Sequence, residues 1–174
     1  VYQSYIDELP KLKPGKKDAQ NYHNLIFNLL KWTFDKMLKN GKKEYPIAQN
    51  TQRVDITFRN HRENGFFKQL AEGYNITCPN IFIECKNYSE DIENPEFAQM
   101  RSRLNGVRGQ FGIIICRSIK NYSKIKERQI DGIKKNEYII ILDDSDIVEL
   151  AKLRLENKDN EIDEFLEQKF NDLT

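Results

Sequence analysis

The sequence contains no apolar run approaching the roughly 20 residues that a membrane-spanning helix needs. It also has few cysteines: Cys78, Cys85 and Cys116 form no Cys-x-x-Cys pair, and an odd number cannot all pair within one chain. The thiols of Cys85 and Cys116 lie in apolar runs, where we expect small core residues. These absences argue against a membrane protein and against a disulfide-stabilised secreted scaffold, so we expect a soluble, cytoplasmic protein with no membrane partner.

Internal repeats, low-complexity linkers and a signal-like apolar stretch are also absent. At 174 residues the chain suits one compact domain, because this length is enough to cover a central sheet with helices. The chain begins at Val1 without an initiator methionine, so we expect a piece of a longer protein with further domains.

The formal net charge of +1 conceals an uneven distribution of charge. Residues 143–174 hold 11 acidic and 4 basic side chains, a net −7 that leaves +8 on residues 1–142. A positive body with an acidic tail is compatible with a polyanionic partner that contacts one face. The alternative is a solvated surface that ends in an acidic helix, and charge alone does not decide between the two.

The first part of the chain separates into an irregular segment and a long helix. Residues 1–17 contain lysine and proline without periodicity, so we expect a loose N-terminal arm with one short helical turn before Pro10. Asp18 can cap a helix whose apolar residues recur at helical spacing, and Lys39 and Gly41 mark its end.

Short β-like runs follow this helix. Residues 45–60 are typical of two strands joined as a hairpin, and residues 81–86 of a third strand. Residues 61–79 between them are polar and long for a plain connection. The aromatic residues of this insertion are Phe66, Phe67 and Tyr74. They could touch a groove or a partner subunit, or they could close the local core as a flap.

The remaining chain alternates helices and strands. We expect helices at residues 95–107, 123–135, 144–155 and 159–173, and strands at residues 111–116 and 138–142. A strand, a helix and a strand in that order form a crossover with parallel strands. Residues 18–158 would then form one α/β domain, a three-layer sandwich with a central mixed β-sheet flanked by helices. Residues 159–174 would be an acidic C-terminal helix packed on it.

Charged residues interrupt two of the predicted strands. Glu84 and Lys86 are two residues apart, so they project from the same face of one strand while Cys85 points to the other layer. Asp55 stands inside an apolar run of the preceding strand, and the two carboxylates converge if these strands pair. Burying either charge alone would be costly, so we expect solvent, a metal or a substrate to reach them.

Converging carboxylates form an oxygen-rich site suited to Mg²⁺ or Mn²⁺. Such a metal polarises a phosphodiester and lowers the pKa of a bound water, and Lys86 would orient that water and offset developing negative charge. Two further acid-x-lysine triplets, beginning at Glu156 and Glu167, lie in polar helical sequence. Context rather than spacing therefore carries the inference, and the alternative is a partly exposed ion pair on an edge strand.

Asp55, the run Glu84-Cys85-Lys86-Asn87-Tyr88, and the helix and apolar strand that follow resemble the PD-(D/E)XK nuclease superfamily. The Mrr-like restriction-endonuclease branch is the most similar part of it. The resemblance covers roughly residues 18–150 and implies a restriction-endonuclease-like fold.

The resemblance also implies roles for individual residues. Asp55 and Glu84 would be metal ligands, with the Cys85 carbonyl as a further ligand. Lys86 would be the catalytic lysine. Some members place a glutamine from the following helix near the site, and Gln99 is the matching residue, with a solvent-facing position as its alternative.

The sequence departs from this family at the first helix. Relatives often carry there a glutamate that reaches the metal, whereas this chain has Tyr22-His23-Asn24. His23 or Asn24 could substitute as a weaker ligand or hold a water, although a lone histidine on a helix is more often a surface or packing residue. The number of bound metals therefore stays open.

Basic residues near the site could neutralise the phosphates that flank a cleaved bond. The candidates are Arg53, Arg59, Arg62, Arg101, Arg103, Arg108, Lys120, Lys124, Lys126 and Arg128. For each of them, an ordinary solvated surface role is an equal alternative.

We therefore expect a Mg²⁺-dependent endonuclease domain that acts on DNA, in a setting such as restriction or defence against foreign DNA. A second hypothesis is a binding or assembly module of the same fold that does not cleave, which the missing first-helix acid favours. A third is a nuclease that acts on RNA or branched DNA. Pairing of two sites in a homodimer is compatible with double-strand cleavage.

Overall fold

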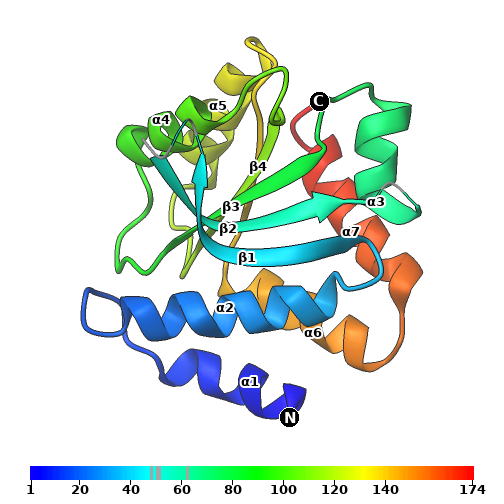
Figure 1. Ribbon diagram of the computed structural model, residues 1–174. Helices are drawn as coiled ribbons and strands as arrows, with labels where there is room; N and C mark the ends of the chain where they lie inside the picture. The colour runs from blue at the N-terminus through cyan, green and yellow to red at the C-terminus, as the bar shows by residue number, and fades with distance from the viewer. Residues whose placement is uncertain (48, 50–51, 62) are drawn as a thin grey trace.

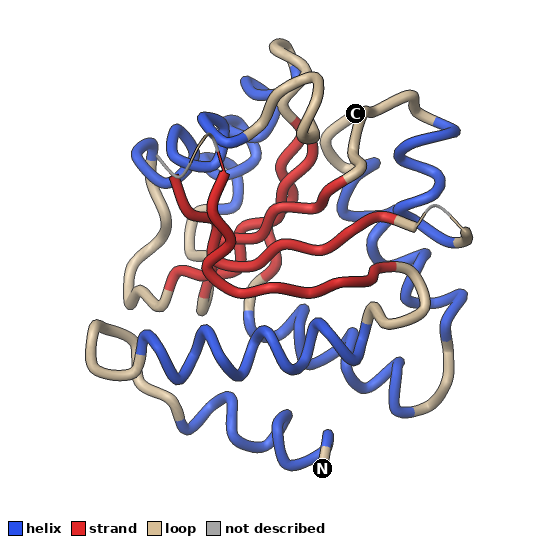
Figure 2. Tube along the Cα trace, in the orientation of Figure 1, coloured by secondary structure: helices blue, strands red, loops and turns tan. Residues whose placement is uncertain are grey.

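The protein is an α/β domain built on one five-stranded sheet, as a computed structural model shows for residues 1–47, 49, 52–61 and 63–174 (Figures 1 and 2). The elements in chain order are α1 (Tyr2–Glu8), η1 (Leu9–Lys11), α2 (Ala19–Thr33), β1 (Leu38–Ile47), β2 (Gln52–Asn60), α3 (Gly65–Lys68), η2 (Gln69–Gly73), β3 (Asn80–Lys86), α4 (Asn94–Arg103), β4 (Phe111–Cys116), α5 (Tyr122–Ile133), β5 (Tyr138–Leu142), α6 (Asp144–Leu155) and α7 (Asp159–Asn171).

The sheet is mixed, with strand order β1-β2-β3-β4-β5. β1, β2 and β3 pair antiparallel, whereas β3, β4 and β5 pair parallel through helical crossovers. Every residue of β4 is buried, as expected for a central parallel strand covered on both faces. The three-layer α/β sandwich with a central mixed sheet is thus confirmed.

Two hydrophobic cores lie on the two faces of the sheet. The larger core joins apolar residues of α2, α6 and α7 to strand residues such as Ile83 and Ile113. The smaller core joins α4 and α5 to the opposite face, where Phe82 and Ile114 pack against Phe97. Figure 1 shows α2 and α6 on one side of the sheet and α4 and α5 on the other. We call these the α2 face and the α4 face.

The insertion between β2 and β3 closes the larger core. Phe66 and Phe67 are buried, and the Phe66 ring lies 6.0 Å from the Phe111 ring and 6.2 Å from the Phe170 ring, in edge-to-face geometry. The Phe66 amide also donates to the Asp163 carboxylate over 2.9 Å. Of the two readings of this segment, the flap over the core agrees with the structure.

The N-terminal arm is not loose, which corrects the expectation for residues 1–17. α1 and η1 bury Ile6 and Leu9 against the larger core, and the Tyr2 ring stacks on Trp32 at 4.1 Å. The arm lacked helical periodicity because its contacts are made by single residues with segments distant in sequence. Its position is therefore set by tertiary packing rather than by local pattern.

The first helix ends earlier and the first strand begins earlier than expected. α2 stops at Thr33, and β1 starts at Leu38 rather than near residue 45. β1 is an edge strand whose lysines face solvent, so its residues show no apolar alternation. Asn40 in the left-handed region (φ 54°) accompanies a register shift between Lys39 and Lys42.

The β1–β2 hairpin bends where it leaves β3. β2 pairs with β3 only as far as Ile56 opposite Ile83, while β1 and β2 remain paired beyond that point. Ile56 packs on the α2 face but Val54 packs on the α4 face, so the strand turns over between them. Glu44, opposite this position in β1, has a left-handed φ of 51°. Figure 1 shows the hairpin curving toward α4.

Candidate active site

Asp55 lies at the bend, at the point where β2 separates from β3. The Cys85 amide donates a hydrogen bond of 2.9 Å to Asp55 Oδ2. The Asp55 side chain thus accepts the bond that a β2 carbonyl oxygen would accept if the two strands stayed paired here. His23 on α2 holds the other side of this residue, since its Nε2 lies 3.0 Å from the Asp55 carbonyl oxygen. Because a carbonyl oxygen only accepts, Nε2 carries the proton. The Asp55 backbone and side chain are therefore both fixed.

Glu84 projects from the neighbouring strand β3 and is 2% exposed. Its carboxyl group lies within hydrogen-bonding reach of the Asp55 carboxylate. Burial and then the negative charge of Asp55 raise the pKa of Glu84 to about 8, against the opposing effects of Arg103 and Lys86. At neutral pH this raised pKa favours the protonated form of Glu84.

Arg103, the last residue of α4, lies beside the Glu84 carboxyl group. Its Nε lies 3.1 Å from Glu84 Oε1, and both side chains are buried. The guanidinium directs its hydrogens elsewhere, because Nε and Nη2 donate to the Arg53 carbonyl oxygen over 3.2 and 2.8 Å. Glu84 Oε1 is accordingly a buried oxygen without a hydrogen-bond partner among the described residues.

Lys86 and Gln99 meet at the open edge of the site. Lys86 Nζ donates to Gln99 Oε1 over 2.7 Å. α4 is oriented by a capping box between Glu93 and Glu96 and by Pro95 in its first turn. This start fixes the helix register that places Gln99 over the end of β3.

Cys85 contributes to the site through its backbone alone. Its side chain packs against the larger core on the α2 face. Burial raises the pKa of its thiol well above the ordinary value, with smaller contributions from Asp55 and Glu84. The thiol is therefore neither a nucleophile nor a thiolate ligand. The backbone carbonyl oxygen is the atom of Cys85 left to act as a metal ligand.

The first helix supplies no carboxylate to the site. Tyr22 donates from its hydroxyl to Asp144 Oδ1 over 2.8 Å, and Asn24 Oδ1 accepts from Lys43 Nζ over 2.9 Å, so neither side chain is directed at the acids. His23 supports Asp55 through its backbone, as described above. Across the described part of the chain, no cluster of three or more histidine, cysteine, aspartate or glutamate side chains is placed to hold a metal.

The carboxyl oxygens of Asp55 and Glu84 nevertheless fit one hard divalent cation as ligands. Two carboxyl groups converge, they repel each other when both are charged, and Glu84 Oε1 lacks a hydrogen-bond donor. A cation with a preference for oxygen would relieve both conditions. With two protein carboxylates, such an ion would keep several water ligands.

The basic residues named from the sequence fall into two groups. Arg53, Arg59 and Lys124 are exposed, on β2 and at the start of α5. The side chains of Arg101 and Arg108 are partly buried: Arg101 lies 3.7 Å from Glu137, and Arg108 donates to the Arg103 carbonyl oxygen. Arg62 lies outside the described residues.

Arg103 requires a correction, because it is 7% exposed and cannot offer its guanidinium to a surface phosphate. Arg103 follows Gln99 by four residues, which places both on one face of α4. Its Nη1 donates to the Gln99 carbonyl oxygen over 3.0 Å.

None of the described helices is long and apolar enough to cross a membrane. No protein-family model and no solved structure matches the chain. A putative transposon gamma-delta 80.3 kDa protein of Escherichia coli (strain K12) is 28% identical over 166 residues, which cover 92% of this chain and 23% of that protein. The chain thus spans less than a quarter of the length of this relative.

Proposed function

We propose that this chain is a metal-dependent endonuclease domain of the PD-(D/E)XK type that hydrolyses phosphodiester bonds in DNA. The observation that carries the proposal is the convergence of Asp55 and Glu84 from neighbouring strands, with Lys86 on the same face of β3. Two acids and a lysine at the separating ends of two strands suit hydrolysis of a phosphodiester.

Asp55, Glu84 and the Cys85 carbonyl would hold a Mg²⁺ or Mn²⁺ ion. When bound, this ion would polarise the phosphate and lower the pKa of a water ligand. Glu84 must lose its proton to serve as a ligand, and burial, followed by the negative charge of Asp55, raises the pKa of that loss to about 8. Arg103 balances part of the negative charge that then develops in the buried pair.

Lys86 is the residue that would orient the attacking water and offset charge on the transition state. Gln99 accepts a hydrogen bond from its ammonium group and so limits the positions of Nζ. Gln99 is exposed, so the lysine faces the side from which a polynucleotide would approach. This contact is the structural support for assigning both residues to catalysis.

DNA is the substrate that the surroundings favour. Exposed Arg53, Arg59 and Lys124 would contact phosphates, and the name of the relative places it with a transposon. We further propose a cytoplasmic protein that acts in restriction or defence, with further domains in a longer chain and a homodimer as the unit that cuts both strands. RNA and branched DNA are the alternative substrates.

A second candidate function is a binding or assembly module that has this fold without cleavage. Two observations favour it: the first helix supplies no carboxylate, and Arg103 already provides a positive charge beside Glu84. In this case nucleic acid would bind over the same surface, and the acids would serve stability alone.

Incubation of the chain with supercoiled plasmid and Mg²⁺ or Mn²⁺ distinguishes the two candidates. We expect cleavage that EDTA stops and that Asp55→Ala and Glu84→Gln abolish. Glu156→Gln is a matched control, because Glu156 begins an acid-x-lysine triplet in an exposed region. Retention of plasmid without cleavage by every variant would replace the endonuclease with the binding module.

A further inference from the structure

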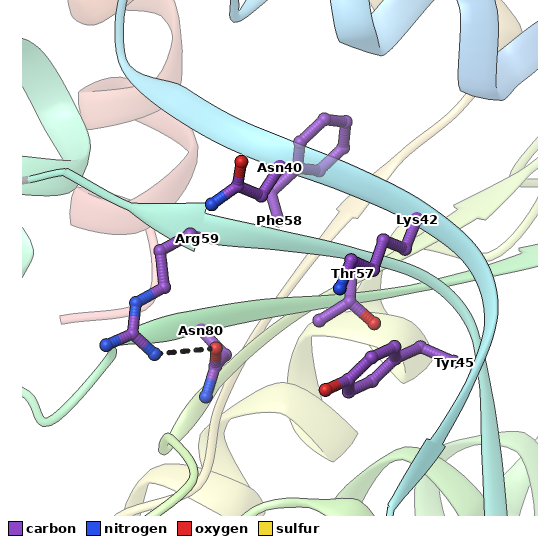
Figure 3. Close-up of a pocket in the computed structure, with 7 residues that line it drawn as sticks. All are labelled: Asn40, Lys42, Tyr45, Thr57, Phe58, Arg59 and Asn80. Atoms are coloured by element: carbon purple, nitrogen blue, oxygen red, sulfur yellow. Dashed lines mark hydrogen bonds between the residues drawn. The ribbon is translucent and has the colours of Figure 1, made fainter.

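A concave site lies inside the bend of the β1–β2 hairpin, on the α4 face of the sheet. Its volume is about 280 Å³. Its lining residues are Asn40, Lys42, Tyr45, Thr57, Phe58, Arg59 and Asn80 (Figure 3). We call this site the hairpin pocket.

The hairpin pocket adjoins the candidate active site. Thr57 follows Asp55 by two residues on β2, so the two residues lie about 7 Å apart along the strand. Asn80 precedes Glu84 by four residues on β3 and shares its face, because alternate residues of a strand project to the same side. A strand of nucleic acid held at the two acids would therefore extend into the pocket within one or two nucleotides.

The charge of the hairpin pocket suits an anion. Among the described residues that line it, Lys42 and Arg59 are cationic and none is acidic. Both side chains are exposed. Within the described part of the chain, Arg59 makes a long hydrogen bond of 3.4 Å to Asn80 Oδ1, which Figure 3 marks. These cations are free to turn toward a phosphate.

Thr57 gives the pocket an unused hydrogen-bonding group. The residue is 6% exposed, and its hydroxyl has no hydrogen-bond partner among the described residues. Figure 3 shows this hydroxyl directed toward the Tyr45 ring. A buried hydroxyl without a partner is unfavourable, and a ligand in the pocket would supply the missing bond.

Tyr45 supplies an aromatic surface beside these polar groups. Its ring is 38% exposed, and Lys42 Nζ lies 5.1 Å from the ring centroid. Sites that combine an exposed aromatic ring with nearby cations bind single-stranded nucleic acid, because the ring stacks on a base while the cations contact its phosphates. A base reaches such a pocket only when it has left the duplex stack.

We propose that the hairpin pocket binds one unpaired nucleotide of the strand held in the active site. The base stacks on Tyr45 and hydrogen-bonds to the Thr57 hydroxyl, while Lys42 and Arg59 contact the adjoining phosphates. This inference rests on the proposed function for the path of the strand, but its test requires no cleavage. It predicts that single-stranded DNA, or duplex DNA with an unpaired nucleotide, is preferred over perfect duplex.

The test measures binding of a short fluorescent oligodeoxynucleotide in EDTA by anisotropy, as single strand and as blunt duplex of equal length. Tyr45→Ala should weaken single-strand binding about tenfold, and Tyr45→Phe should restore it because the ring is kept. Tyr122→Ala is the matched control, since Tyr122 is an exposed tyrosine on α5. An effect of Tyr45→Ala no larger than that of the control overturns the proposal.

Thr57→Val separates binding from structure. Because the hydroxyl has no hydrogen-bond partner in the described part of the chain, the variant should unfold at the same or a higher denaturant concentration while binding single strand a few-fold more weakly. Unchanged affinity in this variant argues that the hydroxyl has no ligand and overturns its assignment.

The combined change Lys42→Ala and Arg59→Ala should lower the slope of log affinity against log salt for single-stranded DNA by about 1.4. The same number of charges removed by Lys134→Ala and Lys135→Ala, two exposed lysines at the end of α5, should leave the slope unchanged. Equal slopes in both double variants contradict the proposal. Pocket-dependent binding without metal-dependent plasmid cleavage would instead reject the endonuclease and keep the nucleotide site.

Discussion

Arg103 Nε and Glu84 Oε1 lie 3.1 Å apart in the protein interior, a contact that connects the end of α4 to the centre of the candidate active site and becomes an ion pair when Glu84 loses its proton. The pair is unusual in that the guanidinium hydrogens point to backbone carbonyl oxygens of Arg53 and Gln99 rather than to the carboxylate. Arg103 thus holds α4 against β2 and provides charge to Glu84 at the same time.

Replacing Arg103 by methionine should lower the free energy of unfolding by about 3 kcal/mol, because it leaves a buried acid without its cation and the Arg53 carbonyl oxygen without its guanidinium donors. Urea unfolding measures this loss. The matched change Arg101→Met, at a partly exposed ion pair with Glu137, should cost below about 1 kcal/mol. Equal losses at the two positions would contradict the role assigned to Arg103.

The titration of Glu84 should make stability depend on pH. Its pKa is about 8 in the folded chain, against 4.5 for an unperturbed glutamate, so the folded chain binds the extra proton between these values. The stabilisation that this proton gives to the folded chain is therefore complete below pH 4.5 and is lost as pH rises through about 8. Glu84→Gln cannot ionise and escapes this loss.

The difference in unfolding free energy between Glu84→Gln and the unmodified chain should thus increase with pH, by up to about 1.4 kcal/mol per pH unit, and level off above the folded pKa. Urea unfolding at a series of pH values checks this. Parallel pH profiles would show that Glu84 titrates as an ordinary glutamate.

Binding of Mn²⁺ should strengthen as pH rises through the pKa of Glu84, because the ion competes with the proton for the same oxygens. Calorimetric titration at about pH 6.5 and about pH 8.5 measures the change. Asp55→Asn should weaken binding at both values. Affinity that is independent of pH would place the ion at another site.

Lys86 and Gln99 should differ in the size of their effect on cleavage. Lys86→Gln should reduce the cleavage rate by about 10² or more, whereas Gln99→Ala should reduce it less, since it only frees the position of Nζ. Gln99 is exposed, so its change should alter stability by below about 0.5 kcal/mol. Gln168→Ala, at a second exposed helix glutamine, is the control for rate and stability. If Gln99→Ala reduced the cleavage rate more than Lys86→Gln, Gln99 rather than Lys86 would have the larger role in catalysis.

His23 should act on cleavage through the Asp55 backbone. His23→Leu leaves a carbonyl oxygen without its donor and should cost about 1 to 3 kcal/mol of stability. His23→Gln keeps a donor and should recover part of both stability and cleavage. A cleavage rate unaffected by His23→Leu would show that the site does not need this support.

The interior strands and the acids were visible in the sequence because each carries a local pattern. Residues 111–116 and 138–142 are continuous apolar runs that only a covered sheet accommodates, and both are strands. Asp143 and Asp144 both suit the start of the following helix, and the structure shows that Asp143 caps it, because its side chain accepts from the Asp146 amide in a capping box.

Features that depend on distant contacts left no such pattern. The start of β1 at Leu38 is set by pairing with Asn60, and its solvent-facing lysines hide the strand period. The docking of the N-terminal arm depends on Arg117, whose Nη2 donates to the Leu12 carbonyl oxygen over 2.8 Å, more than a hundred positions along the chain. The burial of Arg103 likewise depends on β2, which bends only in the folded chain.

The lysine-rich edge strand β1 also bears on how two copies of the chain could associate. Its left-handed positions at Asn40 and Glu44, the register shift after Lys39 and the missing amide hydrogen of Pro46 interrupt the row of groups that a neighbouring strand would need. Joining two sheets into one continuous sheet through this edge is therefore disfavoured, which also guards the chain against fibrous aggregation. A dimer would therefore use a surface other than this edge.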